Sequence, residues 1–356
     1  MVTFLYVLLA LLVFGILIML HELGHFLVAR AAGVGIREFS IGMGPKLFSW
    51  KGKKPAPGTI ETGEPLFTEY SLRALPIGGY VSMVGEDEES ELPCAFDHKK
   101  VSWRIATVLA GPVMNILLGF LLMTVLVLST PKLPSTTIGA FDEGASSVQY
   151  GLQVGDTVTH VNGVRVFTGN ELVYEILNDG YKPLDLTVIR DGKRMELKNV
   201  IFHTIESEGI SFGSADFRVY PEEKNVGSVL KHSFSRSVST VKMIFDQLGD
   251  MIGGRYGINA VSGPVGVTEG MVTAAKSGPD DFLYLVIVIT INLGVFNLLP
   301  FPALDGGRLL FLVVEGVTRK PVNKNVEGYI HFAGLMLLLA LMAVVFFKDI
   351  AGLFTR

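Results

Sequence analysis

The sequence predicts a polytopic α-helical membrane protein with four transmembrane helices, a small inserted α+β domain and a further segment of β-strands. Of its 356 residues, 49% are hydrophobic and only 18% are charged, against about 25% charged residues in an ordinary soluble domain. The apolar residues gather in windows of roughly 18 to 25 residues, the length that a membrane span requires. The net charge of −4 leaves no basic surface of the kind that nucleic acids need, so we expect no nucleic-acid partner.

The first apolar block begins at Val2 and contains no Asp, Glu, Lys, Arg or His before His21. Because it lacks the basic start and the small-residue cleavage site of a signal peptide, we expect it to be retained as a span. The second block contains Gly111-Pro112, at which we expect a bend. The four predicted spans cover residues 3–30, 105–128, 282–299 and 330–347, within a few residues at each end.

Residues 30–104 carry ten Lys and Arg, and residues 308–325 carry Arg308, Arg319, Lys320 and Lys324, whereas nothing before Arg30 is basic except the amino terminus. Basic residues next to spans favour the cytoplasm. We therefore expect both termini, and by alternation the long segment 130–281, to lie outside the cytoplasm.

Residues 131–205 are predicted to form a small α+β domain. Their short β-rich runs are separated by hairpin signals at Asn162-Gly163 and Asp191-Gly192, and residues 171–177 are typical of a short helix. The alternative is a β domain that only spaces the spans.

Residues 206–281 are interpreted as a linker with one amphipathic helix. Between Val226 and Ile252 the apolar residues recur at helical spacing, with basic residues among the polar positions. Such a helix either lies at the membrane surface or packs on the small domain, and the sequence leaves both alternatives open.

Residues 36–83 form neither a span nor an obvious domain. The runs 46–50, 68–75 and 78–83 are typical of strands, and a polar insert rich in Pro and Gly covers 51–65. Non-helical backbone is stable at membrane depth only where it is buried in protein or lines a wet cavity.

His21 and His25 lie four residues apart in the first predicted span. About 6 Å of rise and about 40° of rotation separate them, so both imidazoles can reach one point. With Glu22 between them they form the H-E-x-x-H pattern of two zinc ligands and a general base. Each ionisable residue in hydrocarbon costs about 2.5–3.5 kcal/mol on insertion scales, which a bound dication offsets. The alternative is that His21 and Glu22 only mark the aqueous end of the helix.

A catalytic zinc needs a third protein ligand and an open position for water. No other histidine has an accompanying motif, whereas Asp305 lies just past the third span, on the same predicted side of the membrane as His25. The prolines in 300–302 interrupt regular helix, while Gly306-Gly307 permits unusual dihedrals and close backbone approach. Asp305 is therefore the predicted third ligand, and a helix cap is its alternative role.

These two motifs, each tied to a span, resemble those of the site-2 protease family of intramembrane zinc metalloproteases, in particular the bacterial regulator-of-sigma-E protease type with a single PDZ domain. The resemblance covers nearly the whole chain. Residues 21–25 and 297–307 match the two signatures of the family. Residues 70–81 look like its membrane-associated β-hairpin, and residues 151–166 resemble a PDZ domain of the bacterial protease type.

The resemblance implies an enzyme that hydrolyses peptide bonds in or next to transmembrane segments, in regulated intramembrane proteolysis of substrates such as anti-sigma factors or signal-peptide remnants. The PDZ domain would gate access by size or read the end of an already shortened substrate. Zn²⁺ is the implied cofactor, and the implied site consists of the zinc ligands His21, His25 and Asp305 and the catalytic base Glu22.

Two asparagines complete the implied site. Asn297 matches a family asparagine that contacts the substrate. Asn115 ends a second-span motif, residues 110–115, that is also familiar from the family. It is either a further substrate contact or a polar link between helices.

The implied location is the bacterial inner membrane, with the active site toward the cytoplasm and the PDZ domain outside it. The implied partners are transmembrane protein substrates and the lipid bilayer. Two rival functions are a catalytically silent membrane scaffold and a metal transporter. The intact Glu22 argues against the scaffold, and four spans without an inverted repeat fit a transporter poorly.

Overall fold

The computed structural model of the chain describes residues 2–60, 65–207, 209–255, 257 and 261–355. The chain forms two compact units, one of Met1–Gly119 with Asn259–Arg356 and the other of Phe120–Ile258. The second unit is thus inserted between two parts of the first.

Among the described residues, four helices are long and apolar enough to cross a membrane, which confirms the predicted spans. Each begins before the predicted residue; in α6, for example, Asp280 and Asp281 lie in the first turn, where negative charge is favourable. Only 11% of the apolar window of α8 is buried within the protein, so most of its surface needs the apolar environment of a bilayer. The four helices are α1 (Val2–Ala31), α2 (Val101–Ser129), α6 (Pro279–Leu298) and α8 (Lys324–Thr355).

The first unit also contains the shorter helices α5 (Pro264–Ser277) and α7 (Asp305–Thr318). Helix α5 was not predicted, because residues 206–281 were interpreted as a linker with only one helix, whereas the start of α7 agrees with the alternative role of Asp305 as a helix cap. In the structure Pro264 is the first residue of α5, a position at which the missing N–H has no helical partner to lose.

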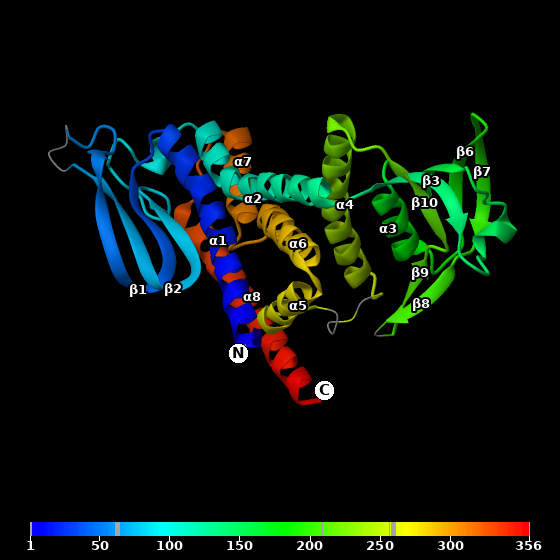
Figure 1. Ribbon diagram of the computed structural model, residues 1–356. Helices are drawn as coiled ribbons and strands as arrows, with labels where there is room; N and C mark the ends of the chain where they lie inside the picture. The colour runs from blue at the N-terminus through cyan, green and yellow to red at the C-terminus, as the bar shows by residue number, and fades with distance from the viewer. Residues whose placement is uncertain (1, 61–64, 208, 256, 258–260, 356) are drawn as a thin grey trace. The chain divides into compact units, whose positions relative to one another are not determined.

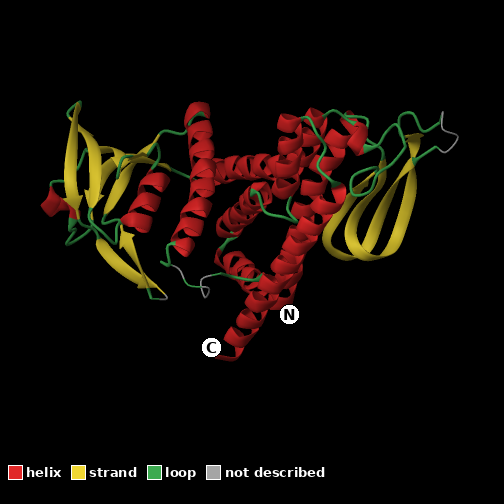
Figure 2. Cartoon of the chain, turned by 180° about the vertical axis from the view of Figure 1, so that it is seen from behind, coloured by secondary structure: helices red, strands yellow, loops and turns green. Residues whose placement is uncertain are grey.

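Between the first two spans lie β1 (Ile36–Pro55) and β2 (Phe67–Met83), which pair antiparallel (Figures 1 and 2). The predicted runs 68–75 and 78–83 are parts of the single strand β2, and β1 includes residues 51–55 of the predicted insert. Both strands bend. Residues 38–41 pair with 79–82 on one side and with 69–72 on the other. The two strands therefore make a four-stranded sheet.

One edge of this sheet is the segment 79–83, and the other is 46–55. The first edge lies against α1, where Val81 and Met83 share an apolar cluster with Leu23 and Phe26. The bent hairpin thus presents one strand edge to the helix that carries the H-E-x-x-H motif.

The second unit has the expected α+β character. Its largest sheet has the strand order β10-β3-β4-β6-β7, with β5 paired to β4, and its core includes Val158, Leu172 and Leu186. Residues 162–163 and 191–192 all have positive φ and connect paired strands, as predicted for these hairpins. The elements up to residue 200 are β3 (Leu133–Phe141), β4 (Thr157–Val161), β5 (Val164–Arg165), α3 (Gly169–Asp179), β6 (Leu184–Arg190) and β7 (Lys193–Val200).

Two further strands lie in the segment predicted to be a linker with one helix, and a third begins at the end of the predicted α+β domain. They are β8 (His203–Ser207), β9 (Ile210–Ser214) and β10 (Phe217–Glu222). The first two pair with each other, and β10 joins the main sheet beside β3. All of β8 is exposed, so its sequence shows no alternation of buried and exposed residues by which a strand could be recognised.

The amphipathic helix is present as α4 (Val226–Ile252), with the predicted limits. Its polar face packs on α3: Ser235 Oγ donates to Glu171 Oε1 at 2.6 Å, and Lys242 pairs with Glu175. Of the two alternatives, packing on the small domain is therefore observed, through the polar side of the helix. Apolar residues such as Phe234 and Ile252 remain exposed.

Candidate metal centre

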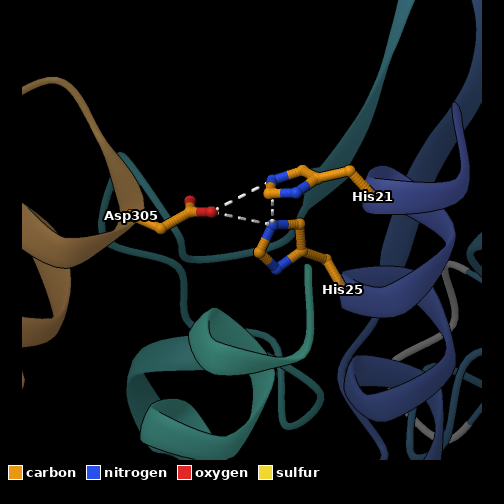
Figure 3. Close-up of side chains that lie close together, drawn as sticks. All are labelled: His21, His25 and Asp305. Atoms are coloured by element: carbon orange, nitrogen blue, oxygen red, sulfur yellow. Dashed lines mark hydrogen bonds and ion pairs between the residues drawn. The ribbon is translucent and has the colours of Figure 1, made fainter. Parts of the chain in front are cut away.

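Two buried imidazoles lie on one face of α1. His21 and His25 are one helical turn apart, and their Nε2 atoms are 3.2 Å from each other (Figure 3). His25 Nδ1 lies 2.8 Å from the carbonyl oxygen of Thr107 on α2. Because that oxygen can only accept, Nδ1 carries the ring proton and Nε2 keeps a free lone pair.

Asp305 approaches the same point from the first turn of α7. Its Oδ2 is 3.0 Å from His21 Nε2 and 3.3 Å from His25 Nε2 (Figure 3). Two chain segments about 280 residues apart in sequence thus direct their ligand atoms into one small volume. Among the described residues, no other group of three His, Cys, Asp or Glu side chains could hold a metal ion in this way.

The turn before α7 is built to bring Asp305 to this point. Ala303 has a φ of +73°, and its N–H donates to His331 Nδ1 at 2.9 Å. A Cβ on Gly306 would overlap the carbonyl of Leu298, so close backbone approach at this glycine is confirmed. The unusual dihedral that the sequence analysis expected at 306–307 lies instead at Ala303.

Arg308, one turn after Asp305, ties α7 to the loop that follows β2. Its guanidinium pairs with Glu86 and, at 2.5 Å, with Asp87. Burial raises the pKa of Glu86, although Arg308 opposes this shift. The pair lies in a weakly hydrated setting, where a charge-assisted contact is stronger than at an open surface.

The three ligand atoms fit zinc. In a tetrahedral site with metal–ligand distances of 2.0–2.1 Å, neighbouring ligand atoms are about 3.3 Å apart. The observed separations are 3.0–3.3 Å. Lone pairs that converge in a buried space are unfavourable unless a cation lies between them. Three protein ligands also leave one tetrahedral position open, as catalytic zinc requires.

Glu22 follows His21 on α1 and belongs to the same site. Its Oε2 accepts a hydrogen bond from the N–H of Val81, at 3.2 Å, on the 79–83 edge of the hairpin sheet. The carboxylate is therefore held between the imidazole-bearing helix and the strand edge. This contact cannot be predicted from the sequence, because the donor is a backbone N–H and not a side chain.

Helix α2 passes very close to α1 behind the imidazoles. A Cβ on Gly111 would lie 2.6 Å from His25 Cε1 and 2.7 Å from Cδ2, and a Cβ on Gly24 would overlap the carbonyl of Ala110. Both glycines allow the helices to meet at the metal centre. From the sequence, Gly111 was predicted only to be part of a bend.

The two predicted asparagines differ in position. Asn115 is fully buried on α2, with Nδ2 3.3 Å from His21 Nδ1. Asn297 is half-buried near the end of α6, and in the described part of the chain no hydrogen bond joins it to His21, His25 or Asp305.

Comparison with known proteins shows a family match over most of the chain. The model of "Peptidase family M50" matches residues 9–341. The regulator of sigma-W protease RasP of Bacillus subtilis is 29% identical over 429 residues, which cover 96% of this chain and 97% of the relative. The zinc metalloprotease RasP of Geobacillus kaustophilus is 31% identical over 428 residues, with 96% and 97% covered.

Proposed function

The chain belongs to peptidase family M50, the site-2 proteases, and we propose that it is a zinc metalloprotease that cleaves peptide bonds in or next to transmembrane segments of other membrane proteins. His21, His25 and Asp305 are the proposed zinc ligands, and Glu22 is the proposed general base. The observation that carries the proposal is the convergence of three ligand atoms within 3.3 Å of one another beside Glu22.

Zinc bound here supplies a Lewis acid that polarises the scissile carbonyl and makes water a nucleophile at neutral pH. Glu22 takes the proton of the attacking water and delivers it to the leaving nitrogen. The N–H of Val81 holds one oxygen of this carboxylate, so the other is free to point at the water.

A transmembrane helix is a poor substrate as it stands, because its carbonyls are engaged in i to i−4 hydrogen bonds. The target must open locally, and inside the bilayer its freed backbone groups need new partners. The 79–83 edge of the hairpin sheet supplies such partners next to Glu22, by addition of the substrate as a further strand.

Proline at Val81 tests the contact between this edge and Glu22. Val81→Pro removes the one N–H of the edge that reaches Glu22, so we expect turnover to fall at least about tenfold, while zinc content falls much less. Lys53→Pro, on the far edge of the same sheet, is the matched control and should leave turnover within about twofold. Equal losses of zinc and turnover in Val81→Pro would argue instead for a structural role.

The inserted unit is proposed to be a PDZ-like domain that restricts access to the site. Its compact β-rich fold around α3 and the PDZ-like sequence at 151–166 support this assignment, and a sheet edge suits an extended peptide. A chain from which this unit is deleted tests how the unit acts. If that chain cleaves long and short substrates alike, the unit excludes substrates by their size and does not bind the end of a shortened substrate.

The proposed location is the bacterial inner membrane, with the metal centre toward the cytoplasm and the termini and inserted unit outside it. The basic residues at 30–104 and 308–325 support this orientation. In a Cys94→Ala background, Ser207→Cys should react with a membrane-impermeant maleimide in intact cells, and Lys320→Cys only after the cells are opened. The opposite pattern would contradict the orientation.

Co-expression with candidate single-span membrane proteins tests the function itself, with bound zinc measured in the same preparation. Cleavage that depends on zinc supports the proposal. Zinc binding without cleavage of any substrate would favour the scaffold, and zinc flux into vesicles that contain the protein would favour the transporter.

A further inference from the structure

Asn115 is buried at the back of the metal centre, and its amide is only partly used. The residue is 0% exposed, and its Nδ2 lies 3.3 Å from His21 Nδ1. Its Oδ1 is buried and has no hydrogen-bond partner among the described residues. A buried carbonyl oxygen without a partner is unfavourable.

The tautomer of the His21 ring decides which amide atom of Asn115 should face it. His21 Nε2 is the ring atom that points at Asp305 and at His25. If zinc binds at Nε2, the ring proton must be on Nδ1, which then needs an acceptor. The amide nitrogen of Asn115 is itself a donor, so N–H to N–H contact at 3.3 Å satisfies neither group.

A half-turn of the Asn115 carboxamide gives Oδ1 a donor and gives the Nδ1 proton of His21 an acceptor. The amide oxygen and nitrogen have nearly the same shape and size, and a half-turn about the last side-chain bond exchanges them. Oδ1 then accepts from His21 Nδ1, and the buried oxygen has its partner.

We infer that Asn115 orients His21 for zinc, with Oδ1 accepting the Nδ1 proton of the ring, and that it does not bind substrate. This inference rests on the proposed assignment of His21 as a zinc ligand. It is an alternative to the substrate contact suggested for Asn115 from the resemblance, and it makes Asn115 a positioning residue.

The geometry around His25 supports this reading. The Nδ1 of His25 already has an acceptor on α2, the helix that also carries Asn115; this acceptor is the carbonyl oxygen of Thr107, at 2.8 Å. Asn115 would give His21 the equivalent acceptor two helical turns further along α2. Such outer contacts fix the tautomer and ring orientation of metal-binding histidines. Gly294 of α6 closes the other side of Asn115, where an added Cβ would be 3.4 Å from the Asn115 Cβ.

The test is the zinc affinity of the full chain in detergent, measured by competition with a chelator. Asn115→Leu keeps the approximate shape but removes the acceptor, and we expect zinc affinity to fall about 10–100-fold. Asn115→Asp keeps an acceptor oxygen and should bind zinc at least as tightly as the wild type. Thr124→Val, which removes a hydroxyl that is bonded only within α2, is the control and should not change the affinity.

Unchanged zinc affinity in Asn115→Leu, with a raised KM for cleavage, would overturn the inference and restore the substrate-binding role. If Asn115→Leu does not accumulate in the membrane, Asn115→Ala compared with Asn115→Asp gives the same contrast. A wild-type chain that binds no zinc would overturn the proposed function together with this inference, so the two failures are distinguishable.

Discussion

Glu22→Gln is expected to abolish cleavage while zinc stays bound. Glutamine has nearly the shape of glutamate, and its amide oxygen can still accept the N–H of Val81 that holds Glu22 Oε2. It cannot take a proton from water, however, and general base catalysis contributes about 10²–10⁴-fold to the rate. We therefore expect turnover of a co-expressed single-span substrate to fall by that factor, with one zinc still bound per chain by elemental analysis.

Two further variants give this result its meaning. Asp305→Asn is expected to lose both zinc and cleavage, because a neutral amide is a poor replacement for an anionic ligand. Glu143→Gln, an exposed carboxylate of the second unit, should change neither. If Glu22→Gln cleaves the substrate as fast as the wild type, another protease cleaves it and this chain serves as a scaffold.

The sequence was sufficient to predict the three side chains that meet at the metal centre. His21 and His25 follow from helical geometry alone, because a spacing of four places both rings on one face. Asp305 needed two arguments together, namely its place at the end of a span and a topology that put it on the same side as His25. The observed separations of 3.0–3.3 Å agree with that reasoning.

What the sequence could not reveal is mostly backbone. The N–H of Val81 and the carbonyl of Thr107 contact Glu22 and His25, yet every residue but proline has an N–H and every residue has a carbonyl. The left-handed conformation at Ala303 was likewise assigned to its glycine neighbours, because glycine is the usual residue with positive φ. In this turn the hydrogen bond from the Ala303 N–H to His331 stabilises the left-handed conformation at Ala303.

The hairpin sheet shows a second limit of the sequence. Its strands were visible as β-rich runs, but their bends and double pairing depend on which segments meet across the sheet. Residues 38–41 have partners on both sides, so the edge at 79–83 that contacts Glu22 emerges only when the pairing is complete. Local patterns predict strands well and strand neighbours poorly.

Gly111→Ala is expected to lose zinc and cleavage together, although the substitution adds only one methyl group. That methyl would lie within 2.7 Å of three atoms of the His25 ring, closer than any van der Waals contact allows, so the ring or the helix must shift. A shift of this size separates His25 Nε2 from Asp305 Oδ2, which are 3.3 Å apart. Zinc content should fall by at least about tenfold, as expected when a ligand is displaced.

Helix propensity cannot account for such a loss, since alanine is favoured over glycine in a helix interior by about 0.5–1 kcal/mol. The same change at Gly328 of α8, where nothing lies within 4 Å of the added Cβ, is the matched control. It should keep zinc and activity and leave thermal stability unchanged or slightly higher. If Gly111→Ala bound zinc as the wild type does, α2 would not be confining His25, and the close packing of α1 and α2 would have another purpose than to hold the metal ligands in place.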